Sequence, residues 1–419
     1  MPRVGVSRSR RSVPMSPPKR IAVLGSTGSI GRSVLSVVEA NPGVFEVLSL
    51  SALSNSGPLA EQAERFGVRR VAIGEDAAGD DVLGGGLEVG VGEEALVALA
   101  EDPDVDLVVN ALVGTAGLPV TAAAVAAGKR LAIANKESLV MAGELVTQLA
   151  ARTGSELIPI DSEHSSIFRC LRGTAEGEVS GVILTASGGP LRDLPMEEMR
   201  EAGVEAVLSH PTWEMGEKIT VDSATLVNKA MEVVEAMWLF DLPEDRVDVV
   251  VHRESLVHSF VQLRDGSLLA HLGSPDMRVP IQYALFYPEA PAVSFDEFRP
   301  ATMGALNFEP VESERYPCFE LVLQSARDGG TAPTTAATAD EVAVGAFLAG
   351  RILFGDIAAV IAATLDAEDT NPATDLAAVF EAERGARVTA GEIVDEIAGR
   401  QAREPADEAQ TNGNPGATH

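Results

Sequence analysis

The chain has 419 residues but only two cysteines, Cys170 and Cys318, and aromatic residues make up just 4% of it. Two isolated cysteines provide neither a disulfide framework nor the spacing of a cysteine-based metal site. No apolar run approaches the roughly 20 residues that a membrane-spanning helix needs. These absences predict a protein of a reducing cytoplasm with no membrane partner.

Basic residues are also scarce, with 32 Lys and Arg against 62 Asp and Glu and a formal net charge of −30. Such a balance argues against nucleic acid or an anionic membrane as a partner. There are only five lysines: Lys19, Lys129, Lys136, Lys218 and Lys229. A lysine inside a motif therefore carries more weight here than in an average sequence.

Two carboxylates follow a short apolar run that is typical of a buried strand. Asp161 and Glu163 come directly after residues 157–160, and a spacing of two would point both side chains to one side of a strand end. Three downstream residues have the spacing of one helix face: Asn228, Lys229 and Glu232. We expect the third carboxylate to meet the first two in one cleft.

Carboxylate oxygens without a Cys or His cluster favour a hard cation, Mg²⁺ or Mn²⁺, which would be placed to polarise a carbonyl. Taken singly, Asp161 could instead cap a helix, and Lys229 and Glu232 could form a surface pair. Taken together, the residues favour a metal site formed by Asp161, Glu163 and Glu232, with an anion site beside it.

Residues 20–24 form a short apolar strand pattern that runs into Gly25, Gly28 and Gly31 and then into a helical pattern over 32–40. A glycine turn between strand and helix lets a pyrophosphate approach the helix N-terminus, although it could also be an ordinary glycine-rich turn. Further strand patterns follow at 45–50, 68–73, 106–112 and 130–134. This alternation predicts a doubly wound, Rossmann-like parallel sheet.

The second strand pattern ends in residues 49–55 without the Asp or Glu that usually binds the ribose of NAD. That absence leans towards NADP. No Lys or Arg stands there to meet a 2′-phosphate, and Arg65 is the nearest candidate.

Three further segments have the composition of site loops. Residues 134–138 follow the last Rossmann-like strand, and 185–190 form a glycine turn with exposed N–H groups. Residues 210–216 carry Trp213 and Met215, which suits a lid over a substrate, although Trp213 could be a buried structural residue.

Eight blocks together resemble the 1-deoxy-D-xylulose 5-phosphate reductoisomerase family, in order from about residue 20 to 399. They are 25–31 (GSTGSIG), 134–138 (ANKES), 161–164 (DSEH), 187–190 (SGGP), 210–213 (HPTW), 222–225 (DSAT), Asn228-Lys229 with Glu232, and 275–278 (PDMR).

The resemblance implies conversion of 1-deoxy-D-xylulose 5-phosphate to 2-C-methyl-D-erythritol 4-phosphate by a metal-assisted rearrangement and reduction by NADPH, in non-mevalonate isoprenoid synthesis. It implies a homodimer. It assigns the metal to Asp161, Glu163 and Glu232, which with Lys136 are the expected catalytic residues. The implied substrate contacts are Lys136, Ser162, Glu163, Ser187, His210, Ser223, Asn228, Lys229 and Glu232. The implied cofactor contacts are Thr27, Gly28, Ser29, Ile30, Asn55, Asn135, Glu137 and Gly216. Candidates for the first proton acceptor are one of the carboxylates, Lys136 and a metal-bound hydroxide.

Three segments depart from the family pattern. Residues 53–55 (LSN) replace a usual Gly-Lys-Asn turn, so that only Asn55 carries over; 337–341 (ATADE) replace Asn-Ala-Ala-Asn-Glu; and 251–255 (VHRES) replace a usual His-Pro-Gln-Ser. None of them removes a metal ligand.

The expected organisation is a disordered leader (1–19), a Rossmann-like NADPH domain (20–160), an α+β catalytic domain (161–291), a linker (292–325), a C-terminal α-helical bundle (326–399) and a flexible tail (400–419). Two other functions remain open: a simple NAD(P)-dependent dehydrogenase, which needs no three carboxylates, and a non-catalytic dinucleotide-binding regulator, against which the intact Lys229 and Glu232 count.

Overall fold

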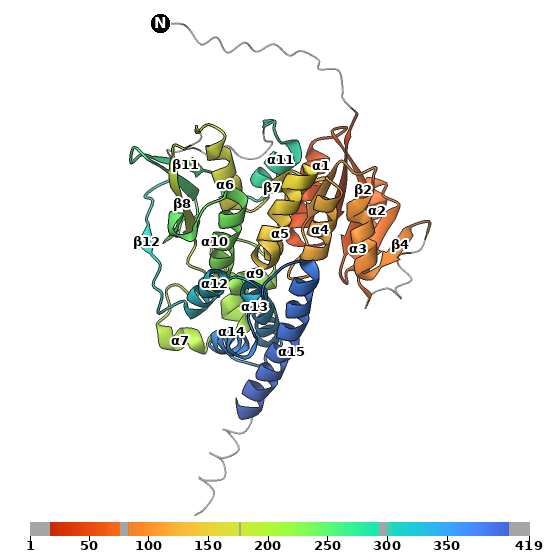
Figure 1. Cartoon of the computed structure of the whole chain (residues 1–419). Helices are drawn as coiled ribbons and strands as arrows, with labels where there is room; N and C mark the ends of the chain where they lie inside the picture. The colour runs from red at the N-terminus through yellow and green to blue at the C-terminus, as the bar shows by residue number, and fades with distance from the viewer. Residues whose placement is uncertain are drawn as a thin grey trace, which may run out of the picture.

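The computed structural model describes residues 17–75, 83, 85–175, 177–292, 299, 301 and 303–401. Most of the expected leader and tail lies outside these residues. Lys19 already belongs to the first strand, and the last helix extends to Gln401. Figure 1 shows the two sheets side by side, with the C-terminal helices below them.

The N-terminal part is a seven-stranded sheet in the order β4-β3-β2-β1-β5-β6-β7, and every neighbouring pair is parallel. Its strands are β1 (Lys19–Leu24), β2 (Phe45–Ala52), β3 (Arg70–Ile73), β4 (Glu88–Val91), β5 (Leu107–Asn110), β6 (Arg130–Ile133) and β7 (Leu157–Pro159). The intervening helices are α1 (Ser29–Ala40), α2 (Ser56–Phe66), α3 (Gly92–Glu101), α4 (Gly117–Ala126) and α5 (Glu137–Thr153). The predicted doubly wound sheet is confirmed, and β4 is an additional strand.

The order of the strands reverses at β1, because the chain moves outward from β1 to β4 on one side and from β5 to β7 on the other. Ligands of such sheets bind at this reversal, outside the carboxyl ends of the strands. Ile21, Ala22, Val23 and Leu24 of β1 are fully buried, as expected for a central parallel strand with helices on both faces.

A second sheet has the order β11-β10-β8-β9-β12, with β8 and β9 parallel and the other pairs antiparallel. The strands are β8 (Val179–Ala186), β9 (Val247–Val251), β10 (Val257–Leu263), β11 (Leu268–Leu272) and β12 (Glu309–Pro310). Helices α6 (Ser162–Leu171) and α10 (Val227–Phe240) pack against it. Shorter helices complete this region: α7 (Met196–Arg200), α8 (Val204–Leu208), α9 (Glu217–Thr225) and α11 (Arg278–Phe286).

The C-terminal helices are α12 (Pro317–Asp328), α13 (Ala332–Leu348), α14 (Asp356–Ala367) and α15 (Leu376–Gln401). The first of them begins inside the expected linker. Every residue from Ala332 to Asp340 of α13 is buried, and Ala and Thr predominate there, which allows close helix packing. Helix α13 contacts α5 and α9 as well as α14 and α15, so the bundle packs directly against both other parts. Among the described helices, none has the length and apolarity to cross a membrane.

The glycine turn after β1 depends on close backbone packing. Gly25 has φ +86°, and a Cβ on Gly31 would lie 2.3 Å from the Gly25 carbonyl oxygen. Gly57 of α2 provides a contrast, because a Cβ there would meet no heavy atom within 4 Å.

We predict that Gly31→Ala lowers the free energy of unfolding by about 1–3 kcal/mol, because backbone atoms must move to admit the methyl group. The matched variant Gly57→Ala should raise it by roughly 0.4–1 kcal/mol, since alanine costs less chain entropy in a helix. Chemical denaturation of both variants measures the difference. Equal stability of the two would contradict the close approach of β1 and α1.

Candidate active site

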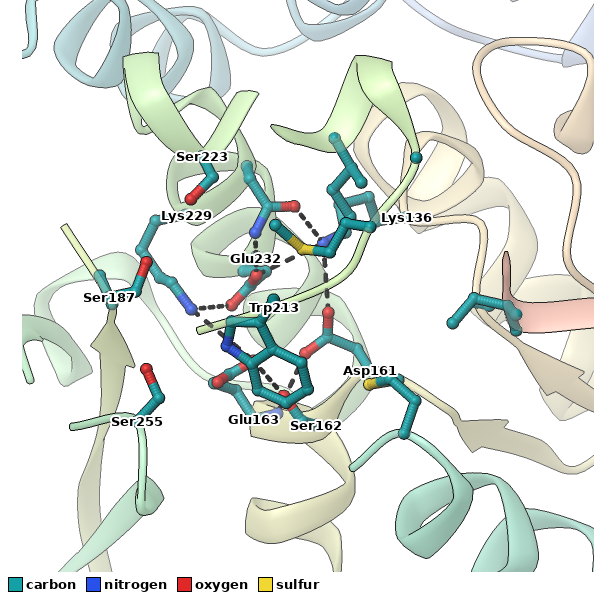
Figure 2. Close-up of a pocket in the computed structure, with 18 of the residues that line it drawn as sticks. Lys136, Asp161, Ser162, Glu163, Ser187, Trp213, Ser223, Lys229, Glu232 and Ser255 are labelled. Atoms are coloured by element: carbon teal, nitrogen blue, oxygen red, sulfur yellow. Dashed lines mark hydrogen bonds and ion pairs between the residues drawn. The ribbon is translucent and has the colours of Figure 1, made fainter. Parts of the chain in front are cut away.

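A cavity of about 150 Å³ lies where the two sheets meet. Figure 2 shows acidic and basic side chains converging on it from several helices and loops. The expected site residues that line it are Ser29, Ile30, Lys136, Asp161, Ser162, Glu163, Ser187, Gly216, Ser223, Asn228, Lys229 and Glu232. The structure therefore brings together residues from across two hundred positions of the chain.

The three predicted carboxylates meet in this cavity. Asp161, Glu163 and Glu232 each offer an oxygen, and these oxygens lie within 4.8 Å of one another. The route to this arrangement differs from the predicted one, because β7 ends at Pro159 and Asp161 is instead the N-cap of α6. Its Oδ1 accepts a hydrogen bond of 3.1 Å from the backbone N–H of Glu163. The predicted strand spacing was wrong as the cause, and Asp161 both caps the helix and faces the cluster.

Helix α10 forms the opposite wall of the cavity, and the residues of its predicted face, Asn228, Lys229 and Glu232, line it. Lys229 and Glu232 are both buried, and Nζ of Lys229 donates a hydrogen bond to Glu232 and lies 3.7 Å from Oε2 of Glu163. Nζ of Lys136 lies 3.1 Å from Oδ2 of Asp161 and 3.4 Å from Oε1 of Glu232. Two ammonium groups thus border three carboxylates.

The ionisation of these groups depends on their burial and on the charges beside them. Burial would lower the pKa of Lys136, but Asp161 and Glu232 raise it above its usual value. Burial, aided by the charges of Glu232 and Asp161, raises the pKa of Glu163 to about 8 despite Lys229. A divalent cation held among the three acids would favour the ionised form of Glu163. The donor set of three carboxylates fits Mg²⁺ or Mn²⁺.

His164, which the sequence did not single out, holds the carboxylates in place from behind. The ring of His164 is fully buried, with Nδ1 2.9 Å from Oδ1 of Asp161 and Nε2 2.9 Å from the carbonyl oxygen of Glu232. Burial would lower the pKa of His164, but Glu235 and Asp161 raise it to about 9. His164 therefore links the two elements that carry the cluster. In the sequence, the spacing of three residues between Asp161 and His164 was the signal that could have indicated this contact.

The other end of the cavity is suited to an anion. Figure 2 shows Ser187, Ser223 and Lys229 on one side of the cavity, away from Asp161. The N-terminus of α10, with Asn228 in its first turn, lies there, and the N-terminus of a helix favours an anion. Nε2 of His210 lies 2.9 Å from Oγ of Ser187, although His210 itself does not line the cavity.

Ser255 is a lining residue that the sequence did not indicate. It is buried with φ +52°, and non-glycine residues in this conformation are concentrated at functional sites.

Burial and the charge of Arg192 lower the pKa of His210 to about 4. The imidazole beside the serines is consequently neutral at pH 7.

The expected cofactor residues fall into two groups. Ser29 and Ile30 line the cavity at the start of α1, for which Gly28 is the N-cap, and Thr27 belongs to the same turn. The second group, Asn135 and Glu137, is buried and does not line the cavity. Nδ2 of Asn135 donates hydrogen bonds of 2.9 Å to the carbonyl oxygen of Gly114 and of 2.8 Å to Glu137.

Gly216 lines the cavity as the N-cap of α9, whereas Asn55 is an exposed N-cap of α2 outside it. Asn55 nevertheless stands just beyond the carboxyl end of β2, where an adenosine ribose lies in folds of this type. Trp213 and Met215 also line the cavity, in agreement with the expected lid.

The fold and the carboxylate cluster define the class: an oxidoreductase that combines a dinucleotide-binding sheet with a metal site. Three family models match the chain: 1-deoxy-D-xylulose 5-phosphate reductoisomerase over residues 21–143, its C-terminal domain over 157–240, and the DXP reductoisomerase C-terminal domain over 272–389. The chain belongs to the 1-deoxy-D-xylulose 5-phosphate reductoisomerase family. This confirms the resemblance and disfavours a simple dehydrogenase or a non-catalytic regulator.

Individual relatives agree. A 1-deoxy-D-xylulose 5-phosphate reductoisomerase of Moorella thermoacetica is 48% identical over 381 residues, which cover 90% of this chain and 98% of the relative. The reductoisomerase of Zymomonas mobilis, solved with NADPH, is 37% identical with a TM-score of 0.80 and covers 90% of this chain and 99% of its own. A DOX-P reductoisomerase solved with NADPH, fosmidomycin and magnesium has 37% identity, a TM-score of 0.85 and coverages of 90% and 98%.

We predict that Glu232→Gln weakens Mn²⁺ binding about 100-fold, because a neutral amide replaces one of three charged ligands. Electron paramagnetic resonance titration of free Mn²⁺ measures this without turnover. Glu214→Gln is the matched control, because Glu214 lines the same cavity outside the cluster and should leave the affinity unchanged. Equal affinity of the two variants would remove Glu232 from the metal site.

Proposed function

We propose that the protein converts 1-deoxy-D-xylulose 5-phosphate to 2-C-methyl-D-erythritol 4-phosphate with NADPH and Mg²⁺ or Mn²⁺, in the synthesis of isoprenoid precursors. The observation that carries this proposal is the meeting of Asp161, Glu163 and Glu232 at one end of a cavity. The other end has the donors for a phosphate, and the N-terminus of the dinucleotide-binding helix lies beside both.

When bound, the cation supplies Lewis-acid polarisation of the substrate carbonyl and NADPH supplies a hydride. The three carboxylates hold the cation, and Ser162 stands between two of them in sequence to contact the substrate. Lys136 is held as a charged ammonium by Asp161 and Glu232. We assign it to stabilise negative charge that develops on substrate oxygens, and not to accept the first proton.

Asn228, Lys229, Ser187 and Ser223 would bind the substrate phosphate at the N-terminus of α10, which favours an anion. Neutral His210 would orient the hydroxyl of Ser187, because the two are within hydrogen-bonding distance. Holding the phosphorylated fragment in this way keeps both pieces of a rearranging carbon skeleton in one cavity. Such orientation contributes several kcal/mol to the lowering of a barrier, roughly 7–11 kcal/mol in the best cases.

The segment 210–216 would exclude water once the substrate is bound. Trp213 and Met215 place apolar surface against the cavity, and Gly216, the N-cap of α9, gives the segment a hinge at its end. Water exclusion strengthens the electrostatic contacts inside the site and protects the reactive intermediate.

On the cofactor side, Thr27, Gly28, Ser29 and Ile30 would bind the pyrophosphate at the start of α1. Asn55 is assigned to the 2′-phosphate end of NADPH. Two other expected contacts, Asn135 and Glu137, would act mainly through the Gly114 loop, whose backbone both of them bind.

We predict that purified protein with 1-deoxy-D-xylulose 5-phosphate consumes NADPH only when Mg²⁺ or Mn²⁺ is present. Glu232→Gln should abolish this turnover while it leaves NADPH binding intact, because Glu232 contacts the metal and not the cofactor turn. Loss of absorbance at 340 nm reports turnover, and parallel assays with NADH measure the cofactor preference. Metal-independent turnover, or full activity of Glu232→Gln, would contradict the proposal.

A homodimer in the cytoplasm completes the proposed function. The edge strand β11 presents exposed Leu268, Leu269 and Leu272, and an apolar edge strand of this kind is suited to pairing with a second copy. A cytoplasmic location accords with the two cysteines, which both occur as free thiols.

We predict a solution mass twice the 43.7 kDa of one chain, measured by light scattering after size exclusion. Leu268→Asp should raise the dimer dissociation constant at least about tenfold, because a charge would enter an apolar interface. Leu353→Asp, at an exposed leucine of the helical bundle, is the control and should stay dimeric. A monomeric wild type would contradict the assignment.

A further inference from the structure

Two adjacent acidic residues of α13, Asp340 and Glu341, extend from the C-terminal bundle to the rim of the active site. We propose that they are positioning residues: Asp340 fixes the start of α9 through Lys218, and Glu341 fixes the crevice loop 112–115 of the cofactor domain. The inference rests on the proposed function, since it assigns the bundle a part in binding NADPH and substrate.

The first contact is a buried cage of charges around Lys218. Its Nζ lies 2.6 Å from Oδ2 of Asp222, 2.9 Å from Oδ2 of Asp340 and 3.5 Å from Oε1 of Glu137. The three carboxylates come from α9, α13 and α5, which belong to three different parts of the fold. One ammonium group therefore ties all three parts together.

Two of these carboxylates carry no other partner for their remaining oxygens. Within the described ranges, Oδ1 of Asp222 and both oxygens of Asp340 have no hydrogen-bond partner, and Asp340 meets Lys218 as an ion pair. Burial and the charge of Asp340 raise the pKa of Asp222, and burial likewise raises that of Asp340. Such unsatisfied buried acids cost stability, so a purely structural bundle has little reason to contain them.

The cage can affect the active site because Lys218 lies on the same helix as Ser223 and next to the segment 210–216. Lys218 lies in the first turn of α9, two residues after Gly216, where the segment 210–216 ends. Asp222 immediately precedes Ser223, which lines the anion end of the cavity. Holding Lys218 therefore sets both the hinge of the lid and the placement of Ser223.

The second contact reaches the cofactor crevice. Oε2 of Glu341 accepts a hydrogen bond of 2.8 Å from the backbone N–H of Thr115, and its Oε1 accepts one of 3.0 Å from Arg387 of α15. A Cβ on Gly114, which has φ +75°, would lie 2.2 Å from Glu341, so the carboxylate lies directly against the loop. On its other side, the N–H of Gly114 donates a hydrogen bond of 3.2 Å to Glu137.

The two contacts form one network, because Glu137 contacts both Lys218 in the cage and the N–H of Gly114 in the loop. The loop 112–115 follows β5, which lies next to β1 at the reversal of strand order, where the dinucleotide would bind. A shift of α13 relative to the sheet would consequently disturb the cofactor crevice and the lid at the same time. The acidic pair thus links the bundle to the two binding steps of the reaction.

Glu341→Ala in the full-length protein tests the loop contact. We expect the dissociation constant for NADPH, measured by fluorescence titration, to rise about tenfold, which corresponds to about 1.4 kcal/mol. Asp395→Ala is the matched control. Asp395 also forms an ion pair with an arginine of the bundle, Arg351, but at an exposed site. Its NADPH affinity should equal that of the wild type.

Asp340→Leu and Asp340→Asn test the cage. The apolar side chain releases Lys218, so we expect kcat/KM for 1-deoxy-D-xylulose 5-phosphate to fall about tenfold, mainly through KM, without a lower melting temperature. Asparagine keeps an acceptor for Lys218 and should restore kcat/KM close to the wild-type value.

Two outcomes would overturn the inference. One is wild-type NADPH affinity in Glu341→Ala, and the other is wild-type kcat/KM in Asp340→Leu with only a changed melting temperature, as a merely structural contact would give. Failure of the proposed function is distinguishable, because wild-type protein would then leave 1-deoxy-D-xylulose 5-phosphate unchanged while the NADPH titration still reports on Glu341.

Discussion

Repulsion among three carboxylates, of which Glu232 is buried and Asp161 and Glu163 are partly buried, is the constraint on which the rest of the site depends. Oxygens of Asp161, Glu163 and Glu232 lie within 4.8 Å of one another, and like charges at such distances repel one another. Lys136 and Lys229 offset part of this repulsion, and in the proposed function a divalent cation would offset more of it. The fold must supply the free energy that holds these carboxylates together when no cation is bound.

The fold provides that energy through burial on either side of the cluster. Asp161 begins α6 after the last strand of the first sheet, while Glu232 lies on α10, which packs against the second sheet. His164 joins the two elements through one hydrogen bond to each. The proposed metal site is thus located at the junction of two hydrophobic cores, and the arrangement of its carboxylates follows from how those cores are packed.

Local sequence patterns predicted the features that depend on neighbouring residues. The glycine turn after β1, the alternation of strands and helices, and the shared face of Asn228, Lys229 and Glu232 all follow from short-range spacing. Strand β4 was missed because its burial is poor, with no fully buried residue. The hydrogen bonds of Asn135 and Glu137 to the Gly114 loop, and the contact of Glu341 with Thr115, join segments that are distant in the chain. Only tertiary packing brings such segments together, so no local pattern could reveal them.

The lysines illustrate how composition and structure are related. Lys136 contacts Asp161, Glu232 and Asn228, and Lys218 contacts Asp222, Asp340 and Glu137. An ammonium group has three N–H donors that can point in three directions, whereas the guanidinium of arginine is a planar fork.

A point at which several acceptors converge therefore suits lysine. The two lysines outside the site follow the same rule at a smaller scale, because Lys19 and Lys129 donate hydrogen bonds to backbone carbonyl oxygens. In a chain with a net charge of −30, arginine provides the basic groups of the surface. Lysine is retained where a compact, three-way donor is needed inside, which is why its position in the sequence was so informative about the site.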